Sequence, residues 1–116
     1  MNNVILSGYI ARKEEVAVTT TGAKTIRFSL AVRRDGVKKD SGKQDTDFIM
    51  IRVFGNLADV IHKYKNVGDF IEVMGKMRVE KGNNDIYYTY VIADKVDFGP
   101  SVRNNVNDTY GAYDEE

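Results

Sequence analysis

The chain has 116 residues, 42% of them hydrophobic, which is enough for one domain with its own core. It contains no cysteine, which excludes disulfide scaffolds, thiol catalysis and cysteine-based zinc sites. No apolar run approaches the roughly 20 residues of a membrane helix, and the first residues lack a signal-peptide pattern. We therefore expect a soluble, cytoplasmic protein with no membrane partner.

The formal net charge of zero hides a strong asymmetry along the chain. Residues 1–81 carry 15 Lys or Arg against 10 Asp or Glu, a balance of +5, whereas residues 82–116 carry 2 against 7, a balance of −5. A basic body with an acidic end presents a positive field to a polyanion even though the average is neutral.

The first third of the chain predicts two strands. Residues 3–11 are apolar and β-branched and predict a strand broken or bent at Gly8, which residues 16–18 continue. A turn with Gly22 at positive φ is expected at residues 19–22. Residues 24–34 then alternate cleanly between apolar and polar side chains, which is typical of a half-buried strand.

The stretch at residues 46–55 organises the rest of the fold. As a strand it would bury Ile49, Ile51 and Val53 on one face. The opposite face would carry Phe48, Met50, Arg52 and Phe54, a combination that suits neither a core nor an ordinary solvated surface. Aromatic rings beside a guanidinium suit a ligand with π-faces and negative charge, such as an unpaired nucleic-acid strand. The competing interpretation is that both phenylalanines pack under a loop or against a second subunit.

A short helix and two further strands complete the predicted domain. Asn56, with Asp59 three residues later, resembles a helix cap, and Leu57, Val60, Ile61 and Tyr64 follow at helical spacing. Residues 69–80 predict a strand with Ile71, Val73, Gly75, Met77 and Val79 on its core face, residues 81–85 a hairpin turn, and residues 86–98 the last strand. Either Tyr87 or the pair Tyr88 and Tyr90 should face the core.

This order of elements predicts an all-β OB-fold, a five-stranded Greek-key barrel with one short helix between the third and fourth strands. We expect the OB-fold domain to span residues 1–99. Residues 100–116 read as an acidic, flexible tail because hydrophobic periodicity stops after Gly99.

The sequence offers little for catalysis. His62 is the single histidine and is expected to face solvent from the helix. Asp45 and Asp47 are expected to face water rather than a metal, and no phosphate-binding loop or metal-ligand motif is present. We expect no enzyme activity, no metal and no cofactor.

The sequence offers more for a binding groove. Basic side chains lie opposite the predicted core faces and in the neighbouring loops, and with the two phenylalanines they describe a charged track with stacking platforms. The candidate DNA-binding residues are Arg27, Arg33, Lys38, Lys39, Phe48, Arg52, Phe54, Lys76, Arg78 and Lys81.

The chain resembles bacterial and bacteriophage single-stranded DNA-binding proteins. The resemblance spans residues 2–98 and is carried by the segments NVILSG (3–8), IRFSLAV (26–32), TDF (46–48), VFGNLAD (53–59), KNVGD (65–69) and VMGKM (73–77). It implies an OB-fold, sequence-independent binding of single-stranded DNA, and a homotetramer with roles in replication, recombination and repair. Phe48 and Phe54 fall where the family has base-stacking aromatics.

Two departures from the family pattern bear on function. The chain has no tryptophan, and its end, Asp114-Glu115-Glu116, lacks the Pro-Phe tip that cellular members use to recruit replication or recombination proteins. The first departure means that part of the family's usual stacking set is missing, and the second favours a phage origin. Two alternatives remain beside DNA binding: an OB-fold adaptor whose Phe48/Phe54 face meets a protein, and a small OB-type nuclease.

Overall fold

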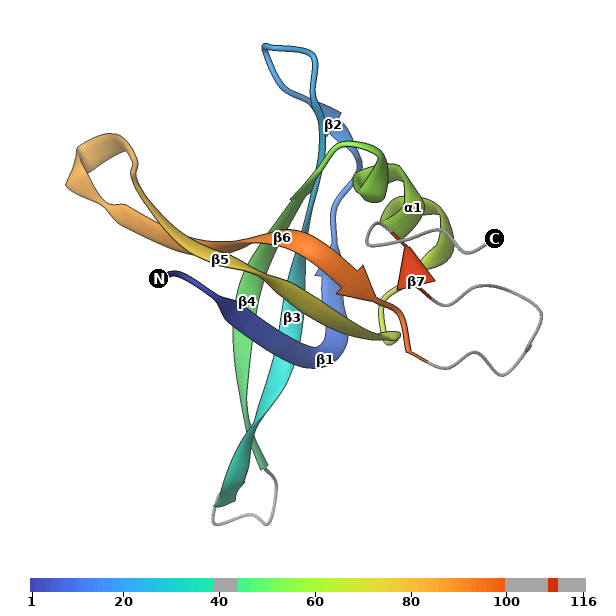
Figure 1. The fold of residues 1–116 in the computed structure, drawn as a ribbon. Helices are drawn as coiled ribbons and strands as arrows, with labels where there is room; N and C mark the ends of the chain where they lie inside the picture. Colours follow the sequence, from blue (N-terminus) through green and yellow to red (C-terminus); the bar gives the residue numbers. More distant parts are fainter. Residues whose placement is uncertain (39–43, 100–108, 111–116) are drawn as a thin grey trace.

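A computed structural model describes residues 1–38, 44–99 and 109–110 (Figure 1). The elements follow in the order β1 (Val4–Lys13), β2 (Ala17–Val18), β3 (Lys24–Lys38), β4 (Gln44–Phe54), α1 (Asn56–Tyr64), β5 (Phe70–Lys81), the short 3-10 helix η1 (Asn83–Asp85), β6 (Tyr87–Asp97) and β7 (Thr109–Tyr110). Five long strands and one helix therefore account for most of the described chain.

The five long strands close into the barrel that the sequence predicts. Their pairing runs β1-β5-β6-β4-β3, and β1 returns to pair with β3, so the sheet has no free long edge. The β4–β6 pairing is parallel and short, Ile51 to Val91 and Arg52 to Ile92. With α1 between the third and fourth barrel strands, β4 and β5, the OB-fold is confirmed.

Gly8 allows β1 to serve both neighbours. The strand pairs with β5 from Val4 to Tyr9 and with β3 from Tyr9 onward. A Cβ atom at Gly8 would lie 2.3 Å from the carbonyl oxygen of Ala31, so only glycine permits this approach of the two backbones. The bend expected at this position is thus the point at which the barrel closes.

The core has the predicted alternation on β3 and on β4, except that Ile49 is only partly buried and packs against the edge of the core. Ile26, Phe28 and Leu30 are buried from β3, and Ile51 and Val53 are buried from β4. Side chains of β1, α1, β5 and β6 complete this core, and among the described residues no polar or charged residue is buried. Burial of this apolar area supplies the main stabilisation of the barrel.

Helix α1 covers one end of the barrel through Ala58 and Ile61, which are both buried. The predicted cap at Asn56 is wrong. The N-cap is Gly55, with φ 81°, and no side chain caps the helix there, because a glycine turn is needed where β4 ends and the chain reverses into the helix. Tyr64 is exposed rather than part of the buried face.

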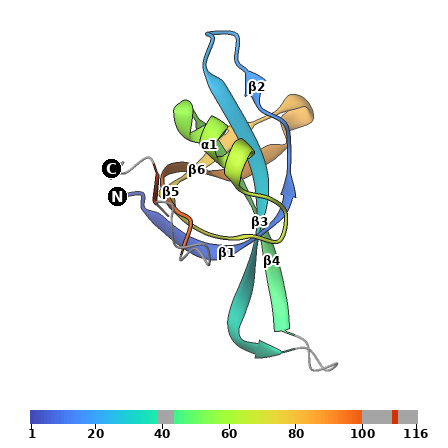
Figure 2. The same ribbon diagram turned by 90° about the vertical axis from the view of Figure 1, so that its right-hand side faces the viewer.

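The β5–β6 hairpin projects beyond the barrel as a two-stranded arm (Figures 1 and 2). Its turn is confirmed at Asn83–Asp85. The predicted core face of β5 holds only as far as Gly75, because Met77 and Val79 lie on the arm, where no second layer covers them, and are exposed. Alternation alone therefore overestimated the length of the buried strand.

The end of the chain contributes one short strand to the described structure. Thr109 and Tyr110 of β7 pair with Asp97 and Val96 of β6. The rest of the predicted acidic tail lies outside the described residues, and the domain boundary at residue 99 stays a prediction. No helix in the described part of the chain is long and apolar enough to cross a membrane.

Candidate nucleic-acid interface

The outer face of the β3–β4 pair carries the two phenylalanines that the sequence singled out. Phe48 is 68% exposed and Phe54 is 38% exposed, so neither is sealed in the barrel. The strand register places Ala31 opposite Phe48 and Thr25 opposite Phe54. Because these partners are small, both rings remain available to a ligand. We call this outer surface, residues 25–33 and 46–54, the β3–β4 face.

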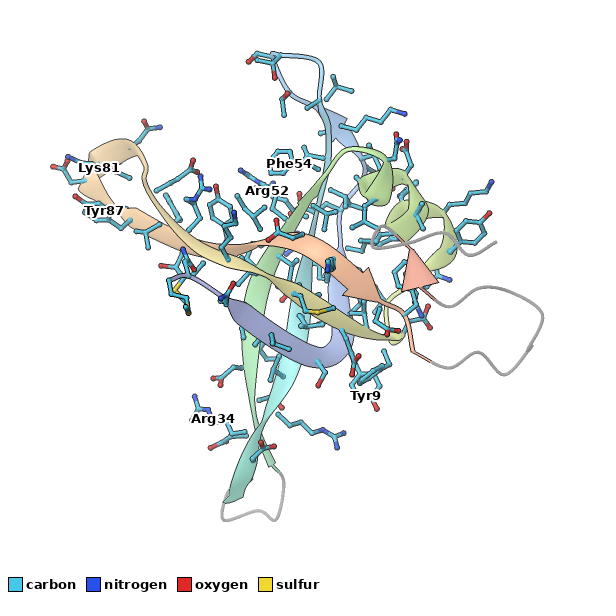
Figure 3. All side chains as sticks on the ribbon, viewed as in Figure 1. Tyr9, Arg34, Arg52, Phe54, Lys81 and Tyr87 are labelled. Carbon is cyan, nitrogen blue, oxygen red and sulfur yellow. The ribbon has the colours of Figure 1, made fainter. Side chains whose placement is uncertain are left out.

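Arg52 lies between aromatic rings on this face. Its guanidinium carbon is 6.0 Å from the centre of the Phe54 ring and 4.8 Å from that of Tyr90. Figure 3 shows Arg52 and Phe54 side by side above the barrel, away from Lys81 and Tyr87 at the far end of the arm. The face therefore combines a cation with stacking surfaces, as the sequence predicts.

The burial of the three tyrosines of β6 matches neither predicted arrangement. Tyr90 is 7% exposed beneath Arg52, whereas Tyr87 and Tyr88 are both exposed. The reason is that Tyr87 and Tyr88 belong to the projecting arm, where both faces meet solvent. Sequence reasoning left Tyr90 without a role because its contact with Arg52 depends on the β4–β6 pairing.

The predicted basic residues fall into two groups. Arg27 pairs with Glu14 at 2.7 Å and Lys81 with Asp85 at 2.9 Å. Within the described residues, no carboxylate lies within ion-pair distance of the remaining basic side chains of this set, which are Arg33, Arg52, Lys76 and Arg78. Their positive charge remains available to an anionic ligand. The exposed pairs of Arg27 and Lys81 are weak enough for a polyanion to displace.

An apolar hollow lies next to Phe48, between β4, β6 and the first residues of β1. It has a volume of about 320 Å³ and is lined by Phe48, Met50, Tyr90 and side chains of β1 and β5. The exposed ring of Phe48 thus borders a second apolar surface, which enlarges the area that a flat ligand could cover.

Comparison with known proteins decides the family. Residues 1–99 match the single-strand binding protein family. This chain belongs to that family. The matched segment is the whole OB-fold described above, including every strand that builds the β3–β4 face.

Curated members of the single-strand binding protein family resemble the chain over most of its length. Single-stranded DNA-binding protein 1 of Streptococcus pyogenes serotype M6 is 36% identical over 90 residues, covering 78% of this chain and 68% of the relative. A protein of the same name from Staphylococcus aureus strain Mu50 is 34% identical over 102 residues, covering 84% of this chain and 65% of the relative. The chain thus spans about two thirds of the length of these bacterial proteins. The predicted phage origin stays a prediction.

One ion pair of this family member was missed at the sequence level. Arg34 donates hydrogen bonds to Asp47, with Nη2 2.8 Å from Oδ1, and lies 3.7 Å from Asp45. The hydrogen bond from Arg34 lowers the pKa of the Asp47 carboxyl below its ordinary value. Both aspartates were expected simply to face water. The β3–β4 register that brings Arg34 to them cannot be seen in the sequence alone.

Two predicted basic residues are only partly covered by the structure. Lys38 ends β3 and its backbone pairs with Gln44, whereas its side chain and the whole of Lys39 lie outside the described residues. Their assignment to the interface stays a prediction.

His62 is half-buried rather than facing solvent, because the helix surface that carries it lies against the segment after β1. Its Nε2 is 3.6 Å from the Glu15 carboxylate, and its buried Nδ1 has no hydrogen-bond partner. Within the described part of the chain, no group of three or more His, Asp or Glu side chains could hold a metal ion.

Proposed function

We propose that the chain binds single-stranded DNA without sequence specificity through the β3–β4 face and the base of the β5–β6 arm. In this proposal Phe48 and Phe54 stack on bases, and the basic side chains neutralise phosphates. The observation that carries the proposal is the pair of exposed phenylalanines on either side of Arg52, on the outer surface of an otherwise well-packed strand. The names of the curated relatives support the same ligand.

Sequence-independent binding follows from the chemistry of this surface. Stacking on an aromatic ring contributes about 1–3 kcal/mol per base and is available to every base. Phosphate contacts carry no sequence information. For each phosphate neutralised, the binding constant falls by about 0.7 log units for every tenfold rise in salt concentration. The proposed contacts to phosphate are made by Arg33, Arg52, Lys76 and Arg78, with Arg27, Lys38, Lys39 and Lys81 as further contributors.

The cellular role we propose is the protection of exposed strands in the cytoplasm during replication, recombination and repair, as a DNA-binding protein and not an enzyme. The family resemblance further supports a homotetramer. Ile5 and Tyr9 on the outer side of β1 are exposed apolar side chains that a second subunit would cover. Replication or recombination proteins are further partners within the same proposal.

A second candidate is the adaptor function, in which the same surface meets a protein. It is favoured by the exposed ring of Phe48 and the apolar hollow beside it, which Met50 also lines. Such an apolar surface is typical of protein contacts as well as of base stacking.

A titration with a labelled oligo-dT at several salt concentrations, followed by fluorescence anisotropy, separates the two candidates. DNA binding predicts saturable binding at low salt that weakens as salt rises, with little binding of a duplex of equal length. A flat titration with oligo-dT at low salt would instead favour the adaptor. Strand cleavage in the presence of magnesium would revive the nuclease alternative.

A further inference from the structure

Within the described part of the chain, Arg52 lies against the ring of Tyr90 without a partner carboxylate. The guanidinium carbon of Arg52 lies 4.8 Å from the centre of a ring that is itself 7% exposed. Among the described residues, no carboxylate and no hydrogen-bond acceptor contacts the side chain of this arginine. The directed contacts of its guanidinium with these residues are therefore those with the aromatic rings of Tyr90 and Phe54.

The charges around Arg52 leave it uncompensated. Arg27 stands directly opposite on β3, and like charges in that position repel each other. Glu14 accepts two hydrogen bonds from Arg27, at 3.0 and 2.7 Å, so the charge of Arg27 is balanced while that of Arg52 is not. Arg52 is only partly buried, so its unused donors can still reach an anionic ligand.

The way in which Arg52 is held leaves its binding groups available. A cation over an aromatic face is attracted by the ring quadrupole and uses none of its N–H donors in that contact. Arginine carries five such donors in a planar fork that matches two oxygens of one phosphate group. The Phe54 ring, whose centre lies 6.0 Å from the guanidinium carbon, is 38% exposed and open to a base.

We propose that Arg52 forms a preformed site for one phosphodiester of bound single-stranded DNA and that Tyr90 is the positioning residue that holds it there. In this arrangement the nucleotide whose phosphate meets Arg52 has its neighbouring base on Phe54. The inference rests on the proposed function, since it assigns a role within the same interface. Because Tyr90 is only 7% exposed, its role is to hold Arg52 and not to stack on a base.

Three substitutions test the assignment by oligo-dT titration over a range of salt. Arg52→Gln should weaken binding about tenfold at low salt. It should also lower the salt slope, the slope of log binding constant against log salt concentration, by about 0.7 in magnitude, which corresponds to the loss of one phosphate contact. Tyr90→Leu, which keeps apolar bulk but removes the ring, should lower affinity and slope in the same direction. Tyr90→Phe keeps the ring and should leave both unchanged. The double variant Arg52→Gln/Tyr90→Leu should bind no more weakly than Arg52→Gln alone, because Tyr90 acts only through Arg52.

The outcomes separate this inference from the function on which it rests. Wild-type protein that does not bind oligo-dT would overturn both. Wild-type binding with an unchanged salt slope for Arg52→Gln would overturn the phosphate site alone. A slope lowered by Arg52→Gln but untouched by a folded Tyr90→Leu variant would overturn the positioning role.

A second measurement does not depend on the folding of Tyr90→Leu. In the NMR spectrum of the wild-type protein without DNA, the Nε–Hε resonance of Arg52, assigned by its loss in Arg52→Gln, should be shifted upfield by the ring current of Tyr90. The resonance should then move on addition of a short oligo-dT. A resonance at the ordinary arginine position in the free protein would contradict the preformed site.

Discussion

Phe28 and Phe48 are the same residue type on neighbouring strands, yet they face opposite ways. Phe28 is 1% exposed and packs in the core, whereas Phe48 is 68% exposed on the β3–β4 face opposite Ala31. The period-two geometry of a strand is enough to separate them. The comparison indicates that the inner face stabilises the barrel, whereas the outer face is available to bind a ligand and contributes little to stability.

The largest effect is expected on the inner face. Phe28→Ala should lower the free energy of unfolding by about 3–5 kcal/mol, because it removes a large buried side chain and leaves a cavity. Phe48→Ala is the matched control and should change stability little, since its ring is already in solvent. Urea denaturation of both variants measures the difference. Equal losses would show that the two phenylalanines do not differ as the structure indicates.

The next effect is expected on the outer face. Phe48→Ala and Phe54→Ala should each weaken oligo-dT binding by about 1–3 kcal/mol, the contribution of one stacked base. Val18→Ala on β2, which also removes an exposed apolar side chain, should leave binding unchanged. Binding and melting temperature should be measured together. A parallel loss of both would mean that these rings belong to the core.

A smaller effect is expected where Glu14, just after β1, balances the charge of Arg27 on the β3–β4 face. Glu14→Gln removes the partner of Arg27 and should strengthen oligo-dT binding by up to about fivefold at low salt, the range of an exposed ion pair. Asp85→Asn is the parallel test, because it releases Lys81 at the end of the arm and should strengthen binding in the same direction. Weaker binding by Glu14→Gln would show that Glu14 positions Arg27 rather than competing with DNA.

The smallest effect is expected at the exposed pair of Arg34 and Asp47. The lowered pKa of Asp47 means that its stabilising contribution is present above the ordinary carboxyl pKa of about 4 and is lost as pH falls through the lower folded value. Thermal melts at neutral pH and near pH 2 should therefore converge for wild type and Asp47→Asn at the acidic end. If the difference in melting temperature between wild type and Asp47→Asn were larger near pH 2 than at neutral pH, the expected pH dependence would be wrong.

The fold and the two faces of β4 could be predicted because both depend on alternation within single strands. The ion pairs could not be predicted, because Arg27 meets Glu14 where β1 runs beside β3, and Arg34 meets Asp47 where β3 runs beside β4. The same holds for Tyr90, which meets Arg52 through the β4–β6 pairing. Met77 was misplaced for a different reason, because alternation does not reveal where a strand leaves the barrel.

Photocrosslinking tests the central claim most directly. Oligo-dT carrying 5-iododeoxyuridine can be bound to the protein, irradiated and mapped by mass spectrometry, since the excited base reacts with aromatic side chains stacked on it. We expect adducts at Phe48 and Phe54, and none at Tyr9 on the outer side of β1. Adducts at Tyr9, with Phe48 and Phe54 unmodified, would contradict the account.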